Sequence, residues 1–296
     1  MLLGWNVAAV TGTAVAGAAL VVGLLSSAPA YSSPSVPGGP SGSPTTPAPT
    51  GTSTASPSPS TSPPTDKLLR PDLRALKARD LSIQTRSDGR QIRFSSALAN
   101  TGLGPIEVRP SNNHPCPPGQ HNSTQILYRD ANGNGIYNPR KDTGVSRHRA
   151  GCMVYHPYHE HWHFKASARY TLLKPAAAEG AEQVVVSARR KVSFCLRDSD
   201  RVPEFMGRWS YPERYGACAR TTPQGISVGW MDVYQSFLAG QSLPLPKGLK
   251  DGIYCLRTVV DPLDQLVETN NDNNSSVREL AIRGNRVKTR TNTHCG

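Results

Sequence analysis

The run Ile253-Tyr254-Cys255-Leu256-Arg257-Thr258-Val259-Val260 decides the fold class of this chain of 296 residues. It is rich in β-branched and aromatic residues, and the turn formers Lys250-Asp251-Gly252 precede it. Such a run between turn formers is typical of a half-buried β-strand. Further runs of the same character occupy residues 91–94, 125–128, 183–187 and 192–196. The sequence therefore predicts several short strands separated by turns.

Helical periodicity is scarce by comparison. Residues 68–79 have the composition of a short helical turn, although Pro71 interrupts it. Residues 198–250 carry little strand signal and are rich in Pro, Gly, Trp and Tyr. A stretch of that length is seldom an idle loop in a folded domain. We therefore predict an all-β, β-sandwich-like domain with long loops and little helix.

The first 65 residues contain no charged side chain, so the 33 Lys and Arg and the 21 Asp and Glu, with their net charge of +12, all follow them. Residues 5–25 form the one apolar run long enough to span a bilayer, which excludes a multi-pass membrane protein. Ala28-Pro29-Ala30 comes next and is a small-x-small pattern of the kind signal peptidase cuts. We predict a signal peptide over residues 1–30; the alternative is an uncleaved membrane anchor. Either places the remainder outside the cytoplasm, secreted or at the cell surface.

Residues 31–65 are almost entirely Pro, Ser, Thr, Gly and Ala, a composition that cannot bury enough apolar surface to fold. We predict a disordered linker there and one folded domain over residues 66–296. That domain carries all six cysteines, at positions 116, 152, 195, 218, 255 and 295, with no CxxC pair. In an exported chain, six cysteines without a CxxC pair predict three disulfides rather than a zinc site. Their pairing stays open at this point.

Four of the eight histidines crowd into residues 156–163. His159, His161 and His163 share a parity, so on a strand their side chains point to one face and a modest bend lets them converge on one ion. Neutral imidazoles suit Cu, Zn, Fe or Ni. His156 has the opposite parity and precedes a proline, which makes it a weaker ligand candidate. The sequence predicts a metal site on these three histidines rather than a solvated polar face.

At this point the sequence resembles the lysyl oxidase family, secreted copper amine oxidases that make a lysine tyrosylquinone cofactor, and looks like a bacterial-type member. Four motifs in order carry the resemblance. They are His156 followed by His159, His161, His163 and then Tyr170-Thr171-Leu172-Leu173; Lys191-Val192-Ser193-Phe194-Cys195-Leu196-Arg197-Asp198; Gln224-Gly225-Ile226-Ser227-Val228-Gly229 with Asp232-Val233-Tyr234; and Gly252-Ile253-Tyr254 with Glu268-Thr269-Asn270-Asn271-Asp272-Asn273-Asn274. The family has Glu where this chain has Arg197.

The resemblance implies that His159, His161 and His163 bind copper and that Lys191 and Tyr234 form the quinone. It implies oxidative deamination of primary amines by O₂, with peptidyl lysine as the family substrate, to an aldehyde, ammonia and H₂O₂. Small primary amines fit the same chemistry. The general base is not assigned: animal members have a His where this chain has Arg169, and Asp232 is a candidate only by its proximity in sequence to Tyr234.

The resemblance also implies a calcium site on Asp72, Glu268, Asn270, Asn273 and Asn274, whose oxygen-rich side chains suit Ca²⁺. A polar hairpin turn is the alternative. The resemblance implies that Cys195 pairs with the next cysteine, Cys218. For the other four cysteines we expect Cys116–Cys152 and Cys255–Cys295, a choice that the resemblance does not fix. Residues 130–142 match the first half of an EF-hand loop, but Lys141 occupies the twelfth place, so a plain turn is an equal alternative.

Two other functions remain open on the residues alone. One is a different three-His metalloenzyme without a cross-link, and the other is a non-catalytic metal-binding module of the cell surface. The net charge of +12 favours anionic partners such as cell-wall polymers. With no nucleic-acid-binding motif and 6% aromatic residues, no nucleic-acid partner is expected. The same charge opposes the approach of a cationic amine, which a working oxidase has to overcome.

Overall fold

The computed structural model describes residues 67–295 except 113, 179–180, 207–211 and 292, and it leaves out the side chains of residues 166 and 190–194. All described residues belong to one compact unit, Thr61–Gly296. The predicted signal peptide and linker lie outside the described residues, and so does the side chain of Lys191. No described helix is long and apolar enough to cross a membrane.

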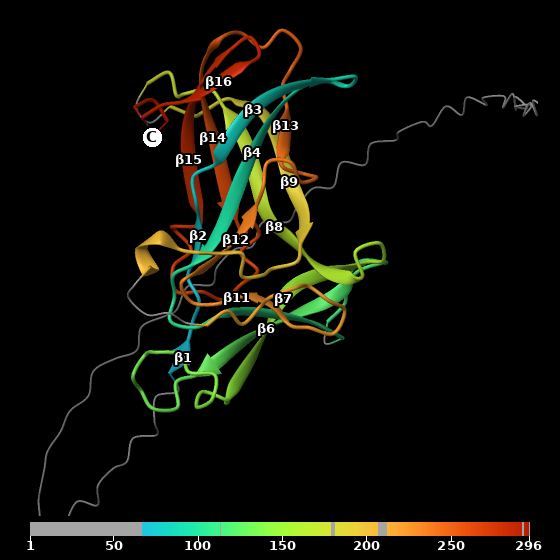
Figure 1. The fold of residues 1–296 in the computed structure, drawn as a ribbon, viewed down its shortest axis with the longest axis vertical. Helices are drawn as coiled ribbons and strands as arrows, with labels where there is room; N and C mark the ends of the chain where they lie inside the picture. Colours follow the sequence, from blue (N-terminus) through green and yellow to red (C-terminus); the bar gives the residue numbers. More distant parts are fainter. Residues whose placement is uncertain (1–66, 113, 179–180, 207–211, 292, 296) are drawn as a thin grey trace, which may run out of the picture. The chain divides into compact units, whose positions relative to one another are not determined.

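Ten strands of the described chain form the larger sheet, and all of its pairings are antiparallel. Its main path runs β11-β5-β6-β7-β8-β14-β15-β16, with β1 added to β6 and β9 added to β8. These strands are β1 (Leu68–Leu69), β5 (Ile106–Ser111), β6 (His121–Arg129), β7 (Val145–His156), β8 (His161–Leu173), β9 (Val185–Phe194), β11 (Gln224–Ile226), β14 (Gly252–Val260), β15 (Ser275–Arg283) and β16 (Arg286–Thr289). Figure 1 shows this sheet turning between its β6–β7 and β14–β15 regions.

Six strands of the described chain form the second sheet around β4, its longest strand. β12 and β13 flank β4 on the main path, β10 pairs with β12, and β2 and β3 also pair with β4. These strands are β2 (Leu73–Ala75), β3 (Arg79–Arg86), β4 (Gly89–Asn100), β10 (Asp200–Arg201), β12 (Trp230–Tyr234) and β13 (Ser242–Pro244).

The core lies between the two sheets. Apolar side chains of β4 and β13 pack against those of β8, β14 and β15 in one cluster. Phe94 of β4 meets Tyr170 of β8 edge-to-face, with ring centroids 4.9 Å apart. The opposed apolar faces follow from the alternation along each strand, which puts every second side chain on the same side of a sheet. The all-β, sandwich-like fold with long loops is therefore confirmed, and the one helical segment described is the 3₁₀ turn Pro203–Phe205.

Two regions differ from the sequence-based expectation. Residues 68–79 hold strands β1 and β2 instead of a helical turn, because Leu69, Leu73 and Ala75 become buried against β6 and β4. The described part of residues 198–250, which omits 207–211, contains four short strands of two to five residues each. Pairing with strands distant in sequence stabilises such short segments, so their own composition gives little signal.

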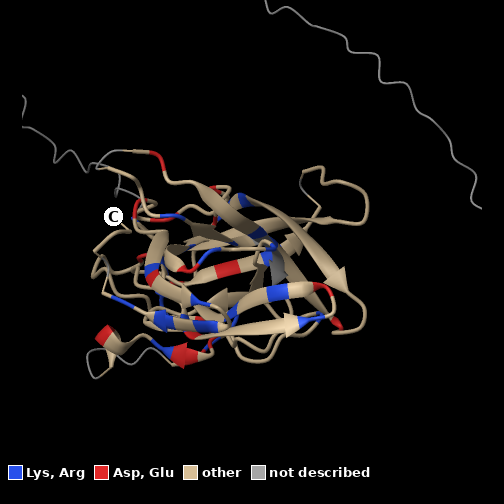
Figure 2. Ribbon diagram, turned by 90° about the horizontal axis from the view of Figure 1, so that it is seen from above, with Lys and Arg blue, Asp and Glu red and all other residues tan. Residues whose placement is uncertain are grey.

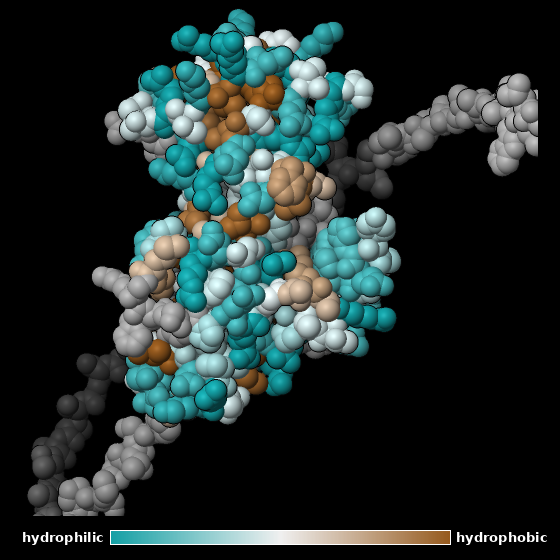
Figure 3. All heavy atoms as spheres, viewed as in Figure 1, coloured by the Kyte–Doolittle hydropathy of each residue, from teal (hydrophilic) through white to brown (hydrophobic). Residues whose placement is uncertain are grey.

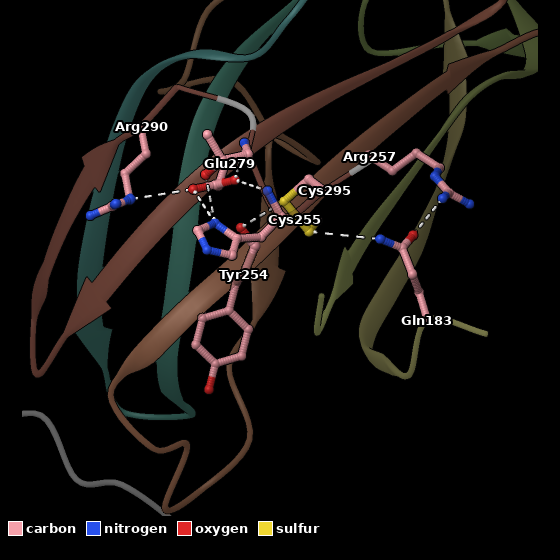
Figure 4. The surroundings of a disulfide bond; sticks show 9 residues. Gln183, Tyr254, Cys255, Arg257, Glu279, Arg290 and Cys295 are labelled. Atoms are coloured by element: carbon pink, nitrogen blue, oxygen red, sulfur yellow. Dashed lines mark hydrogen bonds and ion pairs between the residues drawn. A yellow bond between two sulfur atoms is a disulfide. The ribbon is translucent and has the colours of Figure 1, made fainter. Parts of the chain in front are cut away.

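The C-terminal segment is fastened to the larger sheet beside a disulfide (Figure 4). Cys295 is bonded to Cys255 of β14. The buried carboxylate of Glu279 accepts hydrogen bonds from the backbone N–H groups of Thr293 and His294, both at 2.8 Å, and pairs with Arg290 at 3.2 Å. Cys116–Cys152 and Cys195–Cys218 are the other two bonds, so the three expected pairings are confirmed.

Lys and Arg outnumber Asp and Glu in the sequence, and Figure 2 shows both kinds of residue interspersed along the strands and loops. The face seen in Figure 3 is mostly hydrophilic, with apolar side chains in separate patches. The positive charge is thus spread over the described surface and does not by itself mark a site.

Candidate active site

The hairpin between β7 and β8 creates the histidine cluster. His156 ends β7 and pairs across the ladder with His161, the first residue of β8. The N–H of His159 donates to the carbonyl of His156 at 3.1 Å and closes the turn, in which Glu160 has a φ of 56°. Partners in an antiparallel ladder share a face, so His156 and His161 face the same side, and His163 follows two residues later.

His159 therefore lies in a turn and not on the strand that parity predicted, and the turn itself directs its ring back to the other two. One ring nitrogen from each of His159, His161 and His163 lies within 4.8 Å of the others. The Nε2 atoms of His161 and His163 are 3.0 Å apart. Three converging imidazoles are a donor set suited to copper or zinc.

His156 joins the same cluster although its parity set it apart. Its ring stacks on that of His159 at 4.1 Å and lies 5.1 Å from that of His163. Its Nδ1 is buried and has no hydrogen-bond partner among the described atoms. Burial, reinforced by the charges of His159 and His156, lowers the pKa of His161, which favours the neutral form that binds metals.

Tyr234 comes from the other sheet, at the end of β12, where it pairs with Ser96 of β4. Its hydroxyl lies 3.0 Å from the carbonyl oxygen of Cys195 and donates to the carboxylate of Asp232, two residues earlier on the same face. Burial, together with the charge of Asp232, raises the pKa of Tyr234 well above that of a free tyrosine. The phenol is therefore protonated, with a carboxylate in place to accept its proton.

One cavity of about 1020 Å³ joins the two groups. It is lined by the histidine cluster (His156, His159, His161 and His163), by Tyr234 with Asp232, and by the Cys195–Cys218 disulfide and two arginines. Side chains from the β7–β8 hairpin and from β12 thus face one space, although about 70 residues of the chain lie between the hairpin and β12. We call this space the histidine–tyrosine cavity.

Lys191 lies on β9, where its backbone pairs with Ala168 of β8. Its side chain is outside the described part of the structure. Four residues further along, Cys195 presents the carbonyl that Tyr234 touches. The strand that carries Lys191 therefore runs directly into the wall of the histidine–tyrosine cavity.

A second cluster, of oxygen ligands, lies where the start and the end of the domain meet. The carboxylate of Glu268 accepts the N–H of Leu73 at 2.7 Å and the side-chain amide of Asn274 at 2.6 Å. Asn273 donates to Asp72 at 3.0 Å. Burial raises the pKa of Glu268 to about 7, and the nearby carboxylates of Asp261 and Asp72 add to the rise.

Three oxygens in this region are buried without a partner among the described atoms. They are Oδ1 of Asp261, Asn273 and Asn274. Buried unpartnered oxygens beside carboxylates are the donors that Ca²⁺ prefers. Asp72, Asp261, Glu268, Asn273 and Asn274 are called the oxygen cluster below. Asn270 does not join it, because its side chain is exposed and accepts from the N–H of Asp272.

Asp261 was missed by the sequence analysis. It follows β14 directly in the dipeptide Asp261-Pro262, and its Oδ2 accepts the N–H groups of Gln265 and Leu266 at 2.9 and 2.8 Å. An Asp before Pro at a strand end is a turn signal, and that signal marked the position without indicating a ligand.

A sequence model of the lysyl oxidase family matches residues 133–293, more than half of the chain, and this range includes the histidine cluster, Lys191, Tyr234 and Glu268. The chain belongs to the lysyl oxidase family.

Three relatives illustrate the distance within the lysyl oxidase family. Lysyl oxidase homolog 3 of Homo sapiens is 28% identical over 144 residues, homolog 2 of Gallus gallus 26% over 177 and homolog 4 of Bos taurus 30% over 135. These matches cover 48%, 60% and 45% of this chain but only 17%, 19% and 16% of the relatives. The similarity thus concerns one part of much longer proteins.

The loop of residues 130–142 differs from the EF-hand pattern in the way the sequence suggested. Asp142, one place after Lys141, turns its buried carboxylate back onto the loop and accepts the N–H groups of Ala131 at 3.0 Å and Asn138 at 2.6 Å. Asp130 accepts the N–H of Gly135 at 2.7 Å. In this lysyl oxidase family member the carboxylates of Asp130 and Asp142 thus stabilise the loop by accepting hydrogen bonds from its own backbone.

Proposed function

We propose that this protein is a secreted copper amine oxidase that converts primary amines, with peptidyl lysine as the main substrate, to aldehydes. One amine, one O₂ and one water give one aldehyde, one ammonia and one H₂O₂. The single observation that carries the proposal is the histidine–tyrosine cavity, in which three converging imidazoles share one space with the half-buried Tyr234. Membership of the lysyl oxidase family supports the same chemistry.

Copper is assigned to His159, His161 and His163, whose donor atoms fit it, and His156 packs behind them. The quinone is assigned to Lys191 and Tyr234. Copper held there would supply activation of O₂, and a quinone formed from Tyr234 and Lys191 would supply the two-electron acceptor for the amine. Asp232, Cys195 and the oxygen cluster have further roles beside the assigned copper and quinone positions.

Asp232 is the proton acceptor of the site in this proposal. Its carboxylate is 1% exposed and contacts the hydroxyl of Tyr234, while Ser199 donates to its other oxygen at 3.1 Å. A buried carboxylate at hydrogen-bond distance from the reacting ring meets the geometric requirement for a general base. The carbonyl of Cys195 holds the same hydroxyl from another direction, which fixes the ring.

Calcium is assigned to the oxygen cluster, with a structural role. The cluster joins Asp72, near the start of the domain, to residues 261–274 near its end. Binding would neutralise the crowded carboxylates that raise the pKa of Glu268. The three disulfides are consistent with an extracellular location, where an oxidising environment maintains them.

The experiment is a peptide map of copper-loaded protein with a parallel assay of amine-dependent H₂O₂ release. We expect the peptides containing Lys191 and Tyr234 to be replaced by one cross-linked species that stains for quinone redox cycling. Lys191→Ala should abolish both the cross-link and the peroxide. Lys174→Ala, an exposed lysine just after β8, is the matched control and should leave both intact.

Two outcomes would contradict the proposal. Retained peroxide release in Lys191→Ala would remove the cofactor assignment. Separate Lys191 and Tyr234 peptides in a protein that binds metal through the histidines would favour the other three-His metalloenzyme instead.

A further inference from the structure

The described residues that line the histidine–tyrosine cavity carry more positive than negative charge, which is unexpected for a site that receives a cationic amine. Its described lining residues include two guanidinium groups, Arg189 and Arg197, and one carboxylate, Asp232. A primary amine arrives as a cation, because its usual pKa lies near 10. A cavity with this balance repels an alkylammonium ion, and bound copper would add to the repulsion.

Asp232 does not offset the arginines toward an incoming substrate. Both of its oxygens are engaged, one by the hydroxyl of Ser199 and the other by that of Tyr234, and the residue is 1% exposed. Such a carboxylate keeps its charge but does not pair directly with an incoming ammonium ion, and the two arginines of the described lining still outnumber it.

Arg197, in contrast, is exposed, between the buried residues Leu196 and Asp198. Its charge reaches the reacting end of the cavity, since it acts on the hydroxyl of Tyr234 and opposes the rise in the pKa of that group. Arg189 is exposed as well, with its guanidinium 3.3 Å from the hydroxyl and 3.4 Å from the carbonyl of Ser242. A planar guanidinium in open solvent is well suited to bind a carboxylate.

We propose that the preferred substrates are primary amines that also carry a carboxylate, which Arg197 binds while Arg189 adds to the positive field. The inference rests on the proposed amine oxidase function and specifies its substrate class. The substrate's own carboxylate restores the attraction that a bare ammonium ion lacks. The same arginines then favour loss of the ammonium proton, which the amine must undergo before it reacts. A protein of net charge +12 can in this way attract an amine.

The test compares substrates that differ only in this charge. Aminoalkanoates of four, six and eight carbons are assayed against their primary amides, for example 6-aminohexanoate against 6-aminohexanamide. We expect kcat/KM for at least one acid to exceed that for its amide by about 5- to 10-fold, the effect of a partly solvated charge-assisted contact. High salt should shrink the ratio, since it screens the attraction.

Substitutions of Arg197 test whether this residue causes the preference for the acid over the amide. Arg197→Glu should reverse the preference, so that the amide becomes the better substrate, and Arg197→Ala should bring the ratio close to one. Arg283→Glu is the matched control, because it changes the net charge equally at the exposed end of β15, away from the cavity lining. It should retain the wild-type ratio.

Two further arms complete the test. The peptides acetyl-Gly-Lys-Glu-amide and acetyl-Gly-Lys-Gln-amide distinguish a peptidyl from a free source of the carboxylate. A titration of metal-free Lys191→Ala protein with 6-aminohexanoate, followed by the NMR signals of the ligand, measures binding without turnover. We expect Arg197→Glu to weaken that binding at least about 5-fold.

Equal kcat/KM for every acid and its amide, with no response to Arg197→Glu, would overturn the inference and leave the amine oxidase function standing. Absence of oxidation of every amine would overturn the proposed function, and the titration would then decide whether the carboxylate site exists.

Discussion

The histidine–tyrosine cavity and the oxygen cluster are two polar sites in one β-sandwich, and they are built in opposite ways. The cavity is lined by nitrogen ligands and opens to about 1020 Å³ of space, and its ligands come from one hairpin. The oxygen cluster is buried at Asp261, Glu268 and Asn274 and half-buried at Asp72 and Asn273, and its members come from segments about 200 residues apart. The cavity has room for small molecules, whereas the oxygen cluster joins segments of the chain through hydrogen bonds.

The polar atoms of the two sites also differ in how far their hydrogen bonds are satisfied. In the cavity, the hydroxyl of Tyr234 donates a hydrogen bond to the carboxylate of Asp232. In the oxygen cluster, carboxylates and amides crowd together and three of the oxygens have no partner among the described atoms. Unsatisfied buried oxygens cost stability unless an ion binds them. We therefore expect substitutions in the histidine–tyrosine cavity to change catalysis and substitutions in the oxygen cluster to change the stability of the protein.

The largest expected effect separates the two sites directly. His161→Ala should lower amine-dependent peroxide release by on the order of 10³-fold or more, because ligand loss removes a unit that acts as a whole. Its thermal midpoint should stay near that of the wild type. The measurements are copper content, peroxide release and calorimetry on the same preparation.

His148→Ala is the control, since His148 lies on β7 and hydrogen-bonds to Ser146 outside the cluster. Full activity and full copper content in His161→Ala would show that the three imidazoles are not the metal ligands.

The second prediction concerns Asp232. Asp232→Asn should reduce kcat by about 10²- to 10⁴-fold, the usual contribution of a general base, with a smaller change in KM. Removal of its charge should also lower the pKa of Tyr234, which that carboxylate now raises. The pH profile of quinone formation during copper loading would report both changes.

Asp200→Asn provides the comparison, because Asp200 is an exposed residue on the neighbouring β10. If the two variants behave alike, Asp232 has no special role in proton transfer.

Sequence reasoning reached the fold class because alternation within a strand is local. The runs at residues 91–94, 125–128 and 253–260 fall on β4, β6 and β14. It failed where pairing decides the structure, as at β2, whose three residues are strand only because β4 lies beside them. The strand propensity of a segment does not indicate which distant strand will pair with it.

The same limit applies to the sites. Parity identified His161 and His163 but placed His159 on a strand, whereas a tight turn directs its ring to the others. His156 joins the histidine cluster because it pairs with His161 in the β7–β8 ladder. Asp261 joins the oxygen cluster because it lies in the turn after β14. The spacing of residues in the sequence indicates neither of these positions. Lys191 and Tyr234 came only from the family resemblance, since a lone lysine and a lone tyrosine carry no pattern.

The third prediction tests the oxygen cluster through pH. Since the folded protein holds the pKa of Glu268 near 7 against an ordinary value of 4.5, the native state binds the extra proton between these values. Metal-free protein should therefore lose stability as the pH rises from about 4.5 to 7, by on the order of 3 kcal/mol. Calcium should restore it, weakly at pH 5 and fully above pH 7, because the ion needs the ionised carboxylate.

The measurement is the thermal midpoint with calcium and with chelator across this range. Saturating calcium should raise the midpoint by about 5–10 °C at pH 8. Glu268→Gln should remove both the pH-dependent loss and the calcium response, whereas Asp272→Asn, an exposed acid on the same turn, should preserve both. A calcium response that survives in Glu268→Gln would move the ion elsewhere.

The smallest expected effect distinguishes members of the calcium motif from one another. Asn274→Ala removes a buried amide that donates to Glu268, and should cost about 1–3 kcal/mol of stability together with most of the calcium response. Asn270→Ala should change stability by no more than about 0.5 kcal/mol, because the side chain is exposed and accepts only from the N–H of Asp272. Calcium titrations of the two variants at pH 8 decide the matter. Equal loss of calcium affinity would mean that Asn270 turns inward when the ion binds, and the cluster would then be assembled by its ligand rather than preformed.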